Sequence, residues 1–168
     1  MFQDEVRFGR INAPKACWAR KPVRPSVGVQ LIREYVYVFG AVSPIEGQHD
    51  SLILPVANTE AMSVFLAELS RRYPGEHLLI FLDQAGGHKA KSLRMPENIE
   101  LSFLPPYSPD LNPQEQIGAE LREKFLGHTL FKTLKSVVDT AVNGLCFLAQ
   151  TPERIKSLAA RNWILNPS

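Results

Sequence analysis

The pattern of hydrophobic and polar residues in the first third of the chain predicts three strands. Phe2–Phe8 mixes apolar and charged positions, and Tyr35–Val42 is rich in the β-branched and aromatic residues that are typical of buried strands. A turn with Pro44 and Gly47 leads into a third run at about Ser51–Val56. The second and third runs therefore predict an antiparallel hairpin.

The middle of the chain predicts a helix followed by two more strands. After Asn58 or Thr59, either of which can cap a helix, apolar residues recur at helical spacing as far as Tyr73. Leu78–Leu82 is a continuous apolar run, which is typical of a strand covered on both faces. Ile99–Leu104 predicts the next strand.

The rest of the sequence predicts helices at about Pro113–Leu126, Leu134–Leu148 and Pro152–Ala160. The early strands are expected to pair antiparallel, whereas the two later strands join through crossovers that require parallel neighbours. The order of elements therefore predicts one α/β domain over residues 1–168. We expect a mixed five-stranded sheet, with three antiparallel strands, then two parallel ones, and helices on both faces.

A basic, proline-containing insertion at about residues 12–34 separates the first two strands. Between Val6 and Arg33 the chain has no acidic residue, although its net charge is only +2. The basic residues of this stretch are Arg7, Arg10, Lys15, Arg20, Lys21, Arg24 and Arg33. The asymmetry indicates a basic arm that contacts a polyanion; a solvated, arginine-rich loop is the alternative.

Composition excludes several other classes of protein. The longest apolar runs are strand-sized, which excludes a transmembrane helix, and the acidic N-terminus lacks the apolar core of a signal peptide. The two cysteines, Cys17 and Cys146, have no metal-type spacing. A cysteine-based zinc site is therefore not expected. The cysteine content predicts a reducing, cytoplasmic location.

Two aspartates are candidates for chemistry because of their positions on predicted strands. Asp83 directly follows Leu78–Leu82, where functional groups gather in open α/β sheets, although aspartates at such positions also simply begin loops. Asp4 and Glu5 are neighbours, so in a strand they point to opposite faces. The pattern around them does not decide which of the two shares a face with Asp83.

Glu115 has two interpretations. Asn112 suits a helix N-cap and Pro113 suits the first helical position, so Glu115 completes a capping-box arrangement that contributes about 1 kcal/mol. The first turn of a helix also fixes the direction of a functional carboxylate. Local sequence does not separate these interpretations.

If Asp4, Asp83 and Glu115 meet in space, they provide the hard oxygen ligands that two Mg²⁺ ions need in a phosphoryl-transfer site. His88 and the nearby Lys89 and Lys91 follow Asp83 closely. They either contact a phosphate backbone or form a solvated basic loop.

Three segments, each with one of these carboxylates, carry the motifs of one protein family. Gln3–Gly9 resembles its first-aspartate strand, and Leu82–Lys89 has a histidine five residues after the aspartate. Leu104–Glu115, which reads LPPYSPDLNPQE, places its glutamate 32 positions after Asp83. In these motifs the chain resembles the catalytic DDE domain of mariner-related bacterial insertion-sequence transposases, which have a ribonuclease H-like fold.

The resemblance implies that Asp4, Asp83 and Glu115 are catalytic and hold two Mg²⁺ ions, or Mn²⁺ in their place. Water would cleave a transposon end, and the freed 3′-hydroxyl would then attack target DNA. It also implies a homodimer on double-stranded DNA, in the bacterial cytoplasm and at the nucleoid. The residues expected to contact DNA are Arg7, Arg10, Lys15, Arg20, Lys21, Arg24, His88, Lys89 and Lys91.

The sequence departs from the family pattern in several places. Family members usually have an N-terminal helix-turn-helix region, whereas this chain starts three residues before Asp4, so a separate or missing region is expected to read the transposon ends. Gln84 and Gly86 replace the frequent asparagine and proline, and Gly118 replaces a common tryptophan. Because a helical glycine costs about 1 kcal/mol relative to alanine, Gly118 indicates drift or a different packing.

Two alternatives to a transposase stay open on the sequence. One is a nuclease or resolvase of the same fold that hydrolyses DNA without strand transfer. The other is a non-catalytic remnant that binds DNA or transposase subunits.

Overall fold

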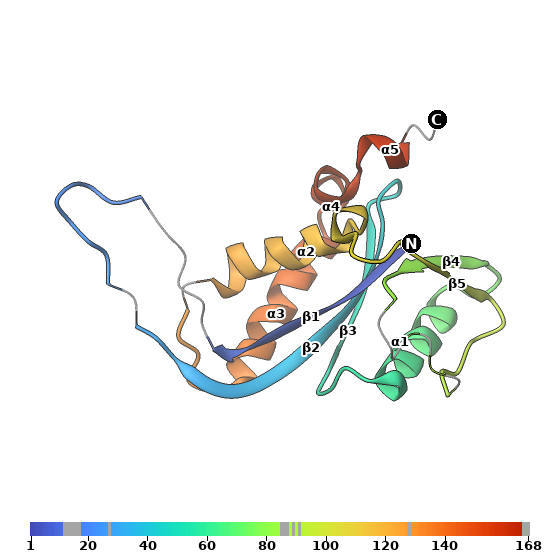
Figure 1. The fold of residues 1–168 in the computed structure, drawn as a ribbon, viewed down its shortest axis with the longest axis horizontal. Coiled ribbons are helices and arrows are strands. Elements are labelled where there is room, and N and C mark those ends of the chain that lie inside the picture. Colours follow the sequence, from blue (N-terminus) through green and yellow to red (C-terminus); the bar gives the residue numbers. More distant parts are fainter. Residues whose placement is uncertain are drawn as a thin grey trace.

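A five-stranded sheet runs through the protein in a computed structural model, which describes residues 1–11, 18–26, 28–84, 88, 90, 92–127 and 129–165 (Figure 1). The strands, in the spatial order β3-β2-β1-β4-β5, are β1 (Phe2–Ile11), β2 (Leu31–Ser43), β3 (Gln48–Leu54), β4 (Leu78–Leu82) and β5 (Ile99–Phe103). β1, β2 and β3 pair antiparallel, and β4 lies parallel to both β1 and β5. The predicted mixed sheet, including its hairpin, is confirmed.

Helices cover both faces of the sheet, as predicted (Figure 1). On one face, α1 (Thr59–Arg72) buries its apolar stripe against β2, β4 and β5. On the other, a second core cluster joins β1 and β2 to α2 (Gln114–Leu121), α3 (Leu134–Ala149) and α4 (Pro152–Ala159). Within the described ranges, no helix is long and apolar enough to cross a membrane.

The C-terminal helices differ in detail from the prediction. Where one helix was predicted over Pro113–Leu126, a 3₁₀ turn η1 (Pro109–Leu111) precedes α2, and a π-helical turn η2 (Arg122–Leu126) follows it. A short helix, α5 (Asn162–Leu165), was not predicted. Its Trp163 packs edge-on against Phe2 at a ring-centroid distance of 6.0 Å.

The alternation of side chains along β1 assigns Asp4 and Glu5 to their faces. Phe2, Val6 and Phe8 are buried in the cluster beneath α2, α3 and α4. Asp4 has the same parity, so it points to this face, and Glu5 points to the other. This resolves the choice that the ragged sequence pattern left open.

β4 is covered less completely than its apolar run predicts. Leu78, Ile80 and Leu82 are buried against α1, but Leu79, on the opposite face, is 39% exposed. The prediction of burial on both faces is therefore wrong at Leu79, because the helices of that layer pack over β1 and β2 instead.

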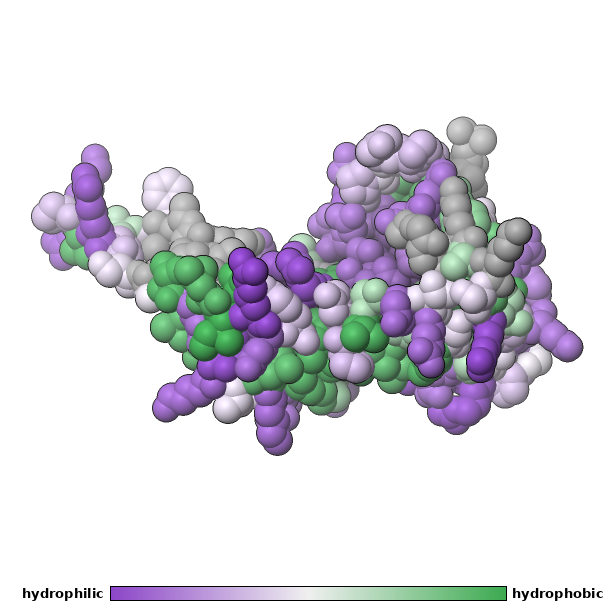
Figure 2. Space-filling model, turned by 60° about the horizontal axis from the view of Figure 1, so that its bottom comes forward, coloured by the Kyte–Doolittle hydropathy of each residue, from purple (hydrophilic) through white to green (hydrophobic). Residues whose placement is uncertain are grey.

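Residues 18–26 of the basic insertion lie away from the body of the protein and form an arm between β1 and β2 (Figure 1). Residues 18–26 are all exposed and form no helix or strand, and β2 begins at Leu31, three residues before the predicted end of the insertion. Trp18 is fully exposed. Figure 2 shows hydrophobic residues where the arm joins the body, and Val29 and Leu31 are exposed there.

Close packing of α2 on β1 explains the glycine at position 118. A Cβ placed on Gly118 would lie 2.5 Å from Cγ2 of Val6, a separation that real Cβ atoms essentially never show. Val6 is buried and β-branched, so its side chain has few alternative rotamers. Gly118 therefore reflects a packing of α2 that leaves no room for a larger residue.

We predict that Gly118→Ala destabilises the protein by about 1 kcal/mol or more. Overpacking typically costs about 1–3 kcal/mol, which outweighs the gain of about 1 kcal/mol in helix propensity. Urea unfolding measures the change. Combining the variant with Val6→Ala should recover part of the loss, because the two residues are in contact. A more stable single variant would contradict the packing explanation.

Candidate active site

Asp4, Asp83 and Glu115 line one cavity of about 420 Å³. The carboxylates come from β1, from the residue after β4 and from the first turn of α2, respectively. The other lining residues are Gln84, Leu104, Pro105, Pro106, Tyr107, Ser108, Pro109 and Asn112. The proline-rich motif therefore forms much of the cavity wall and also supplies Glu115.

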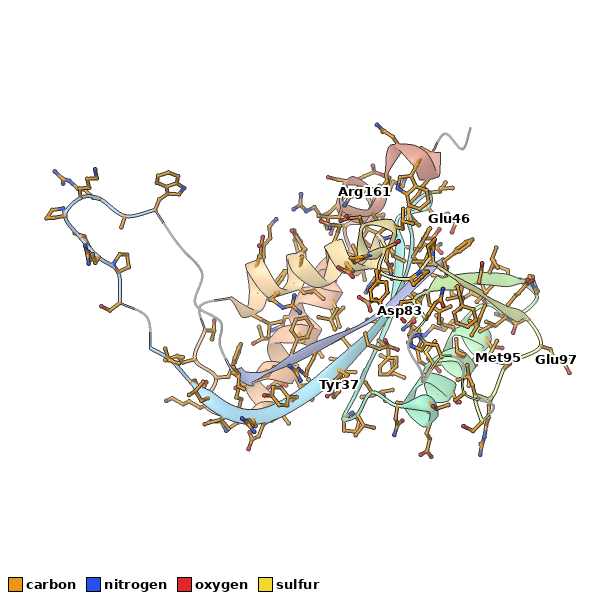
Figure 3. The ribbon with its side chains drawn as sticks, in the orientation of Figure 1. Tyr37, Glu46, Asp83, Met95, Glu97 and Arg161 are labelled. Atoms are coloured by element: carbon orange, nitrogen blue, oxygen red, sulfur yellow. The ribbon has the colours of Figure 1, made fainter. Side chains whose placement is uncertain are left out.

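Strand register places the two aspartates side by side. Phe2 of β1 is paired with Phe81 of the parallel strand β4, and their rings stack at 5.1 Å. Asp4 and Asp83 each follow two residues later, so they occupy equivalent positions on neighbouring strands and share a face. Figure 3 labels Asp83 at this point, near the start of β1.

Asn112 holds the Glu115 helix against β1. Its side-chain Nδ2 donates to the Gln3 carbonyl at 2.8 Å, and its Oδ1 accepts from the Gln114 N–H at 3.1 Å. Its own N–H donates to the Pro109 carbonyl at 2.8 Å, so this N–H is engaged by the preceding 3₁₀ turn. Asn112 thus binds the first N–H of α2 through its side chain, but the capping box that would use Glu115 is not formed, and the Glu115 residue is exposed.

The three carboxylates repel one another. Burial, together with the charges of Glu5, Glu115 and Asp83, raises the pKa of Asp4 to about 7, although a hydrogen bond from the Glu5 N–H acts in the opposite direction. The Glu115 residue is exposed overall, but partial desolvation of its carboxyl, together with the charges of Asp110 and Asp83, raises the pKa of Glu115. The cavity is therefore a site of concentrated negative charge, which a bound cation would relieve.

The donor set of the cavity suits a hard divalent cation. Carboxylate oxygens are the ligands that Mg²⁺ and Mn²⁺ prefer, and the pKa values of Asp4 and Glu115 are raised, that of Glu115 in spite of the nearby Arg122 charge. Among the described residues, however, no group of three or more histidine, cysteine, aspartate or glutamate side chains is already gathered closely enough to hold a metal ion. The chemistry of the residues fits a metal, and ligation would draw them together.

His88 links Glu5 of β1 to Asp83 of the Leu82–Lys89 motif, and its side chain does not point to solvent. It is 7% exposed, with Nε2 2.9 Å from Oε1 of Glu5 and Nδ1 2.9 Å from Oδ1 of Asp83. Burial would lower the pKa of His88, but the hydrogen bond and charge of Glu5, together with Asp83, raise it overall. In this structure the side chain is enclosed between two acids, and the predicted contact of His88 with DNA stays a prediction.

Arg10 is also engaged inside the protein. Its Nε donates to the Phe131 carbonyl and its Nη1 pairs with Glu34, both at 2.9 Å, and its side chain is only 14% exposed. Arg10 supports the base of the arm in this structure, and its predicted contact with DNA stays a prediction. Arg7 is exposed, with its guanidinium 4.6 Å from the centre of the Tyr35 ring.

The remaining expected DNA contacts fall into two groups. Arg20, Lys21 and Arg24 are exposed on the arm, where a polyanion can reach them. Lys15, Lys89 and Lys91 lie outside the residues that the structure describes.

Two glutamines near the carboxylates were not identified as functional from the sequence. Gln84 donates from Nε2 to the Leu104 carbonyl at 2.9 Å, which ties the Asp83 segment to the start of the proline-rich loop. Gln114 is buried over Gly40, which pairs with Asp4, and its Nε2 lies 3.1 Å from Nε2 of His49. Neither contact has a sequence signature, since both join distant segments.

The family of the chain follows from comparison with known proteins. A family model described as DDE superfamily endonuclease matches residues 1–138, which is most of the chain. The chain belongs to this family. A curated relative, the uncharacterized protein y4pE/y4sA of Sinorhizobium fredii (strain NBRC 101917 / NGR234), is 40% identical over 130 residues, covering 77% of this chain and 96% of that protein.

Solved structures of Mos1 complexes share the fold of this DDE family member. The Mos1 strand transfer complex covers 95% of the chain with a TM-score of 0.59 and 17% identity. The mariner Mos1 paired end complex with Mg covers 95% with a TM-score of 0.56 and 18% identity. The predicted ribonuclease H-like fold and the family resemblance are confirmed. The chain spans 54% and 55% of these Mos1 chains, about half of their length.

We predict that Asp4→Asn stabilises the metal-free protein in a pH-dependent way. The carboxyl has an ordinary pKa of 3.8 and a folded-state pKa of about 7, so the folded state binds the extra proton between these values and loses stability as the pH rises through them. Asp4→Asn has no carboxyl to titrate at this position, so its stability does not fall with rising pH for this reason. Its advantage in unfolding free energy should be on the order of 1–3 kcal/mol at pH 8 and much smaller at pH 4.

Urea unfolding in a chelating buffer measures the advantage of Asp4→Asn at both pH values. Mg²⁺ added at pH 8 should reduce the difference in unfolding free energy between the variant and the original chain, because the cation stabilises only the protein that keeps the carboxylate. An advantage of equal size at both pH values would contradict a charge origin.

We predict that Asn112→Asp costs about 2–4 kcal/mol of stability. The aspartate can still accept from the Gln114 N–H, but it cannot donate to the Gln3 carbonyl and it adds a charge at a buried position. Gln116→Ala, a change at an exposed position of α2, is the control and should cost under about 0.5 kcal/mol. Equal unfolding free energies for the two variants would show that Asn112 does not hold α2 to β1.

Proposed function

We propose that this chain is the catalytic domain of a DNA transposase that cuts and joins DNA strands with the help of divalent metal. The observation that carries the proposal is the shared cavity of Asp4, Asp83 and Glu115 in a member of the DDE superfamily endonuclease family. The similarity of the fold to that of the Mos1 strand transfer complex supports the same proposal.

Asp4, Asp83 and Glu115 would hold the metal, as two Mg²⁺ ions or Mn²⁺ in their place. Metal bound there supplies an activated water or hydroxyl and stabilisation of the leaving oxygen. The protein contributes the placement of the ligands. His88 orients the Asp83 carboxylate from inside the protein, and Asn112 fixes the helix that carries Glu115.

Double-stranded DNA is the proposed substrate, as transposon end and as target. The exposed basic residues of the arm, Arg20, Lys21 and Arg24, would contact a phosphate backbone or an adjacent subunit of a homodimer on DNA. Another Mos1 structure is a paired-end complex with left transposon end. Because this chain spans about half of a Mos1 chain, we propose that a separate region reads the transposon ends here. A bacterial cytoplasmic location at the nucleoid follows from this role.

A second candidate is a nuclease or resolvase that hydrolyses DNA without strand transfer. The description of the family as an endonuclease covers cleavage alone, so it favours this candidate as much as a transposase. Both candidates use the same carboxylates and differ in whether a DNA 3′-hydroxyl can replace water as the nucleophile.

We predict Mg²⁺- or Mn²⁺-dependent nicking of supercoiled plasmid DNA by the intact chain, lost by a factor of about 100 or more in Asp83→Asn and in Glu115→Gln. Each variant removes a charged ligand while keeping the size of the side chain. Glu97→Gln is the matched control, since Glu97 is exposed and lies far from Asp83 in Figure 3. Circular dichroism checks that all variants are folded.

Strand transfer is tested in the same assay with a precleaved duplex that has a free 3′-hydroxyl. Joined product supports the transposase, and nicking without joined product supports the hydrolase. A folded chain that nicks no DNA with either metal, alone or with a DNA-binding region supplied in trans, would contradict both enzymes and support the non-catalytic remnant.

A further inference from the structure

Tyr107 has a position that packing within the protein does not explain. Its side chain is fully exposed, with a relative accessibility of 102%, yet it lines the cavity of the three carboxylates. Its backbone has φ +58°, a conformation that non-glycine residues with bulky side chains rarely adopt. The chain thus holds an unfavourable backbone geometry in order to present an aromatic ring to solvent beside the cavity.

The loop that carries Tyr107 is fixed at both ends. At its start, the Leu104 N–H donates to the Leu82 carbonyl at 2.8 Å, and Gln84 binds the Leu104 carbonyl. At its end, Asn112 binds β1 through the Gln3 carbonyl. Pro105, Pro106 and Pro109 restrict the backbone between these anchors. The ring is therefore presented at a defined place and costs little ordering entropy when it binds a partner.

The acidic cavity determines which kind of contact a DNA strand can make there. Phosphates are repelled by the carboxylates unless metal is bound, so charge alone does not draw DNA to this wall of the cavity. An aromatic ring attracts the face of a nucleobase without regard to charge or sequence. A stacked base would locate a strand whose phosphate lies near the carboxylates.

We propose that Tyr107 stacks on an unpaired nucleobase next to the phosphodiester that enters the carboxylate cavity. The inference rests on the proposed function, and it adds that the DNA engaged at this site has a base exposed by a strand end or by local unpairing. Tyr107 then acts as a substrate-positioning residue that binds the nucleobase, while the carboxylates act on the neighbouring phosphodiester.

The test uses a short duplex whose single-stranded 3′ extension carries 2-aminopurine, a base whose fluorescence falls when it stacks on an aromatic ring. Measurements in Ca²⁺ neutralise the cavity and separate binding from the cleavage assay. Tyr107→Phe keeps the ring. Tyr107→Asn removes it but tolerates positive φ, so this variant should fold and unfold at a temperature no lower than that of the original chain.

The expected result is quenching by the original chain and by Tyr107→Phe, with quenching lost in Tyr107→Asn and the dissociation constant raised roughly 5- to 150-fold. Glu97→Gln, as control, should bind like the original chain. Full quenching and unchanged affinity in Tyr107→Asn would overturn the proposal. A change in self-association of this variant by sedimentation, with DNA binding intact, would overturn it too, because the ring would then contact protein.

Failure of the stacking proposal can be told apart from failure of the proposed function. One outcome is nicking of plasmid DNA without quenching of the 2-aminopurine in the extended duplex, or with quenching that does not depend on the ring. This result would support the enzymatic function and contradict stacking by Tyr107. Ring-dependent quenching by a chain that nicks nothing supports the stacking contact and refutes the catalytic function.

Discussion

The buried amide of Asn112 is the interaction on which the geometry of the cavity depends. Asparagine has both a donor and an acceptor on one short side chain, and Asn112 uses the first on the Gln3 carbonyl of β1 and the second on the Gln114 N–H of α2. The residues next to these partners in the chain are Asp4 and Glu115. One side chain thus sets the spacing between the strand that carries one carboxylate and the helix that carries another, and Gly118 allows the helix to lie close.

Charge distinguishes the acids that line the cavity from an acid that has a structural role. Glu115 and Glu120 are both on α2. Glu120 is 7% exposed, but it pairs with Arg154 and Lys124 at 2.8 Å, and although burial raises its pKa these partners lower it overall. Glu115 faces Asp83 and Asp110 instead, and its pKa is raised. A fold that gathers like charges at one place while pairing a buried acid on the same helix with cations indicates that the first group serves a ligand.

Much of the fold could be predicted because the hydrophobic pattern records local burial. The continuous and alternating apolar runs marked all five strands, and the helical stripe of α1 marked that helix within a residue at its start. The misses depend on neighbours that are distant in the chain. The exposure of Leu79, the short helix α5 and the split of the predicted Pro113–Leu126 helix each follow from which elements pack nearby.

The sequence by itself determined the family, the order of the strands along the chain and the three carboxylates as candidates, because motif spacing and apolar periodicity are local properties. It also contained the proline-rich motif, but it did not separate a capping role for Glu115 from a role in the cavity. Only the tertiary structure shows that the capping box is not formed, because Asn112 gives its N–H to Pro109, and that Glu115 lines the same cavity as Asp4 and Asp83. The enclosure of His88 and Arg10, and the exposure of Trp18 and Tyr107, were decided in the same way, since burial depends on what the rest of the chain places around a residue.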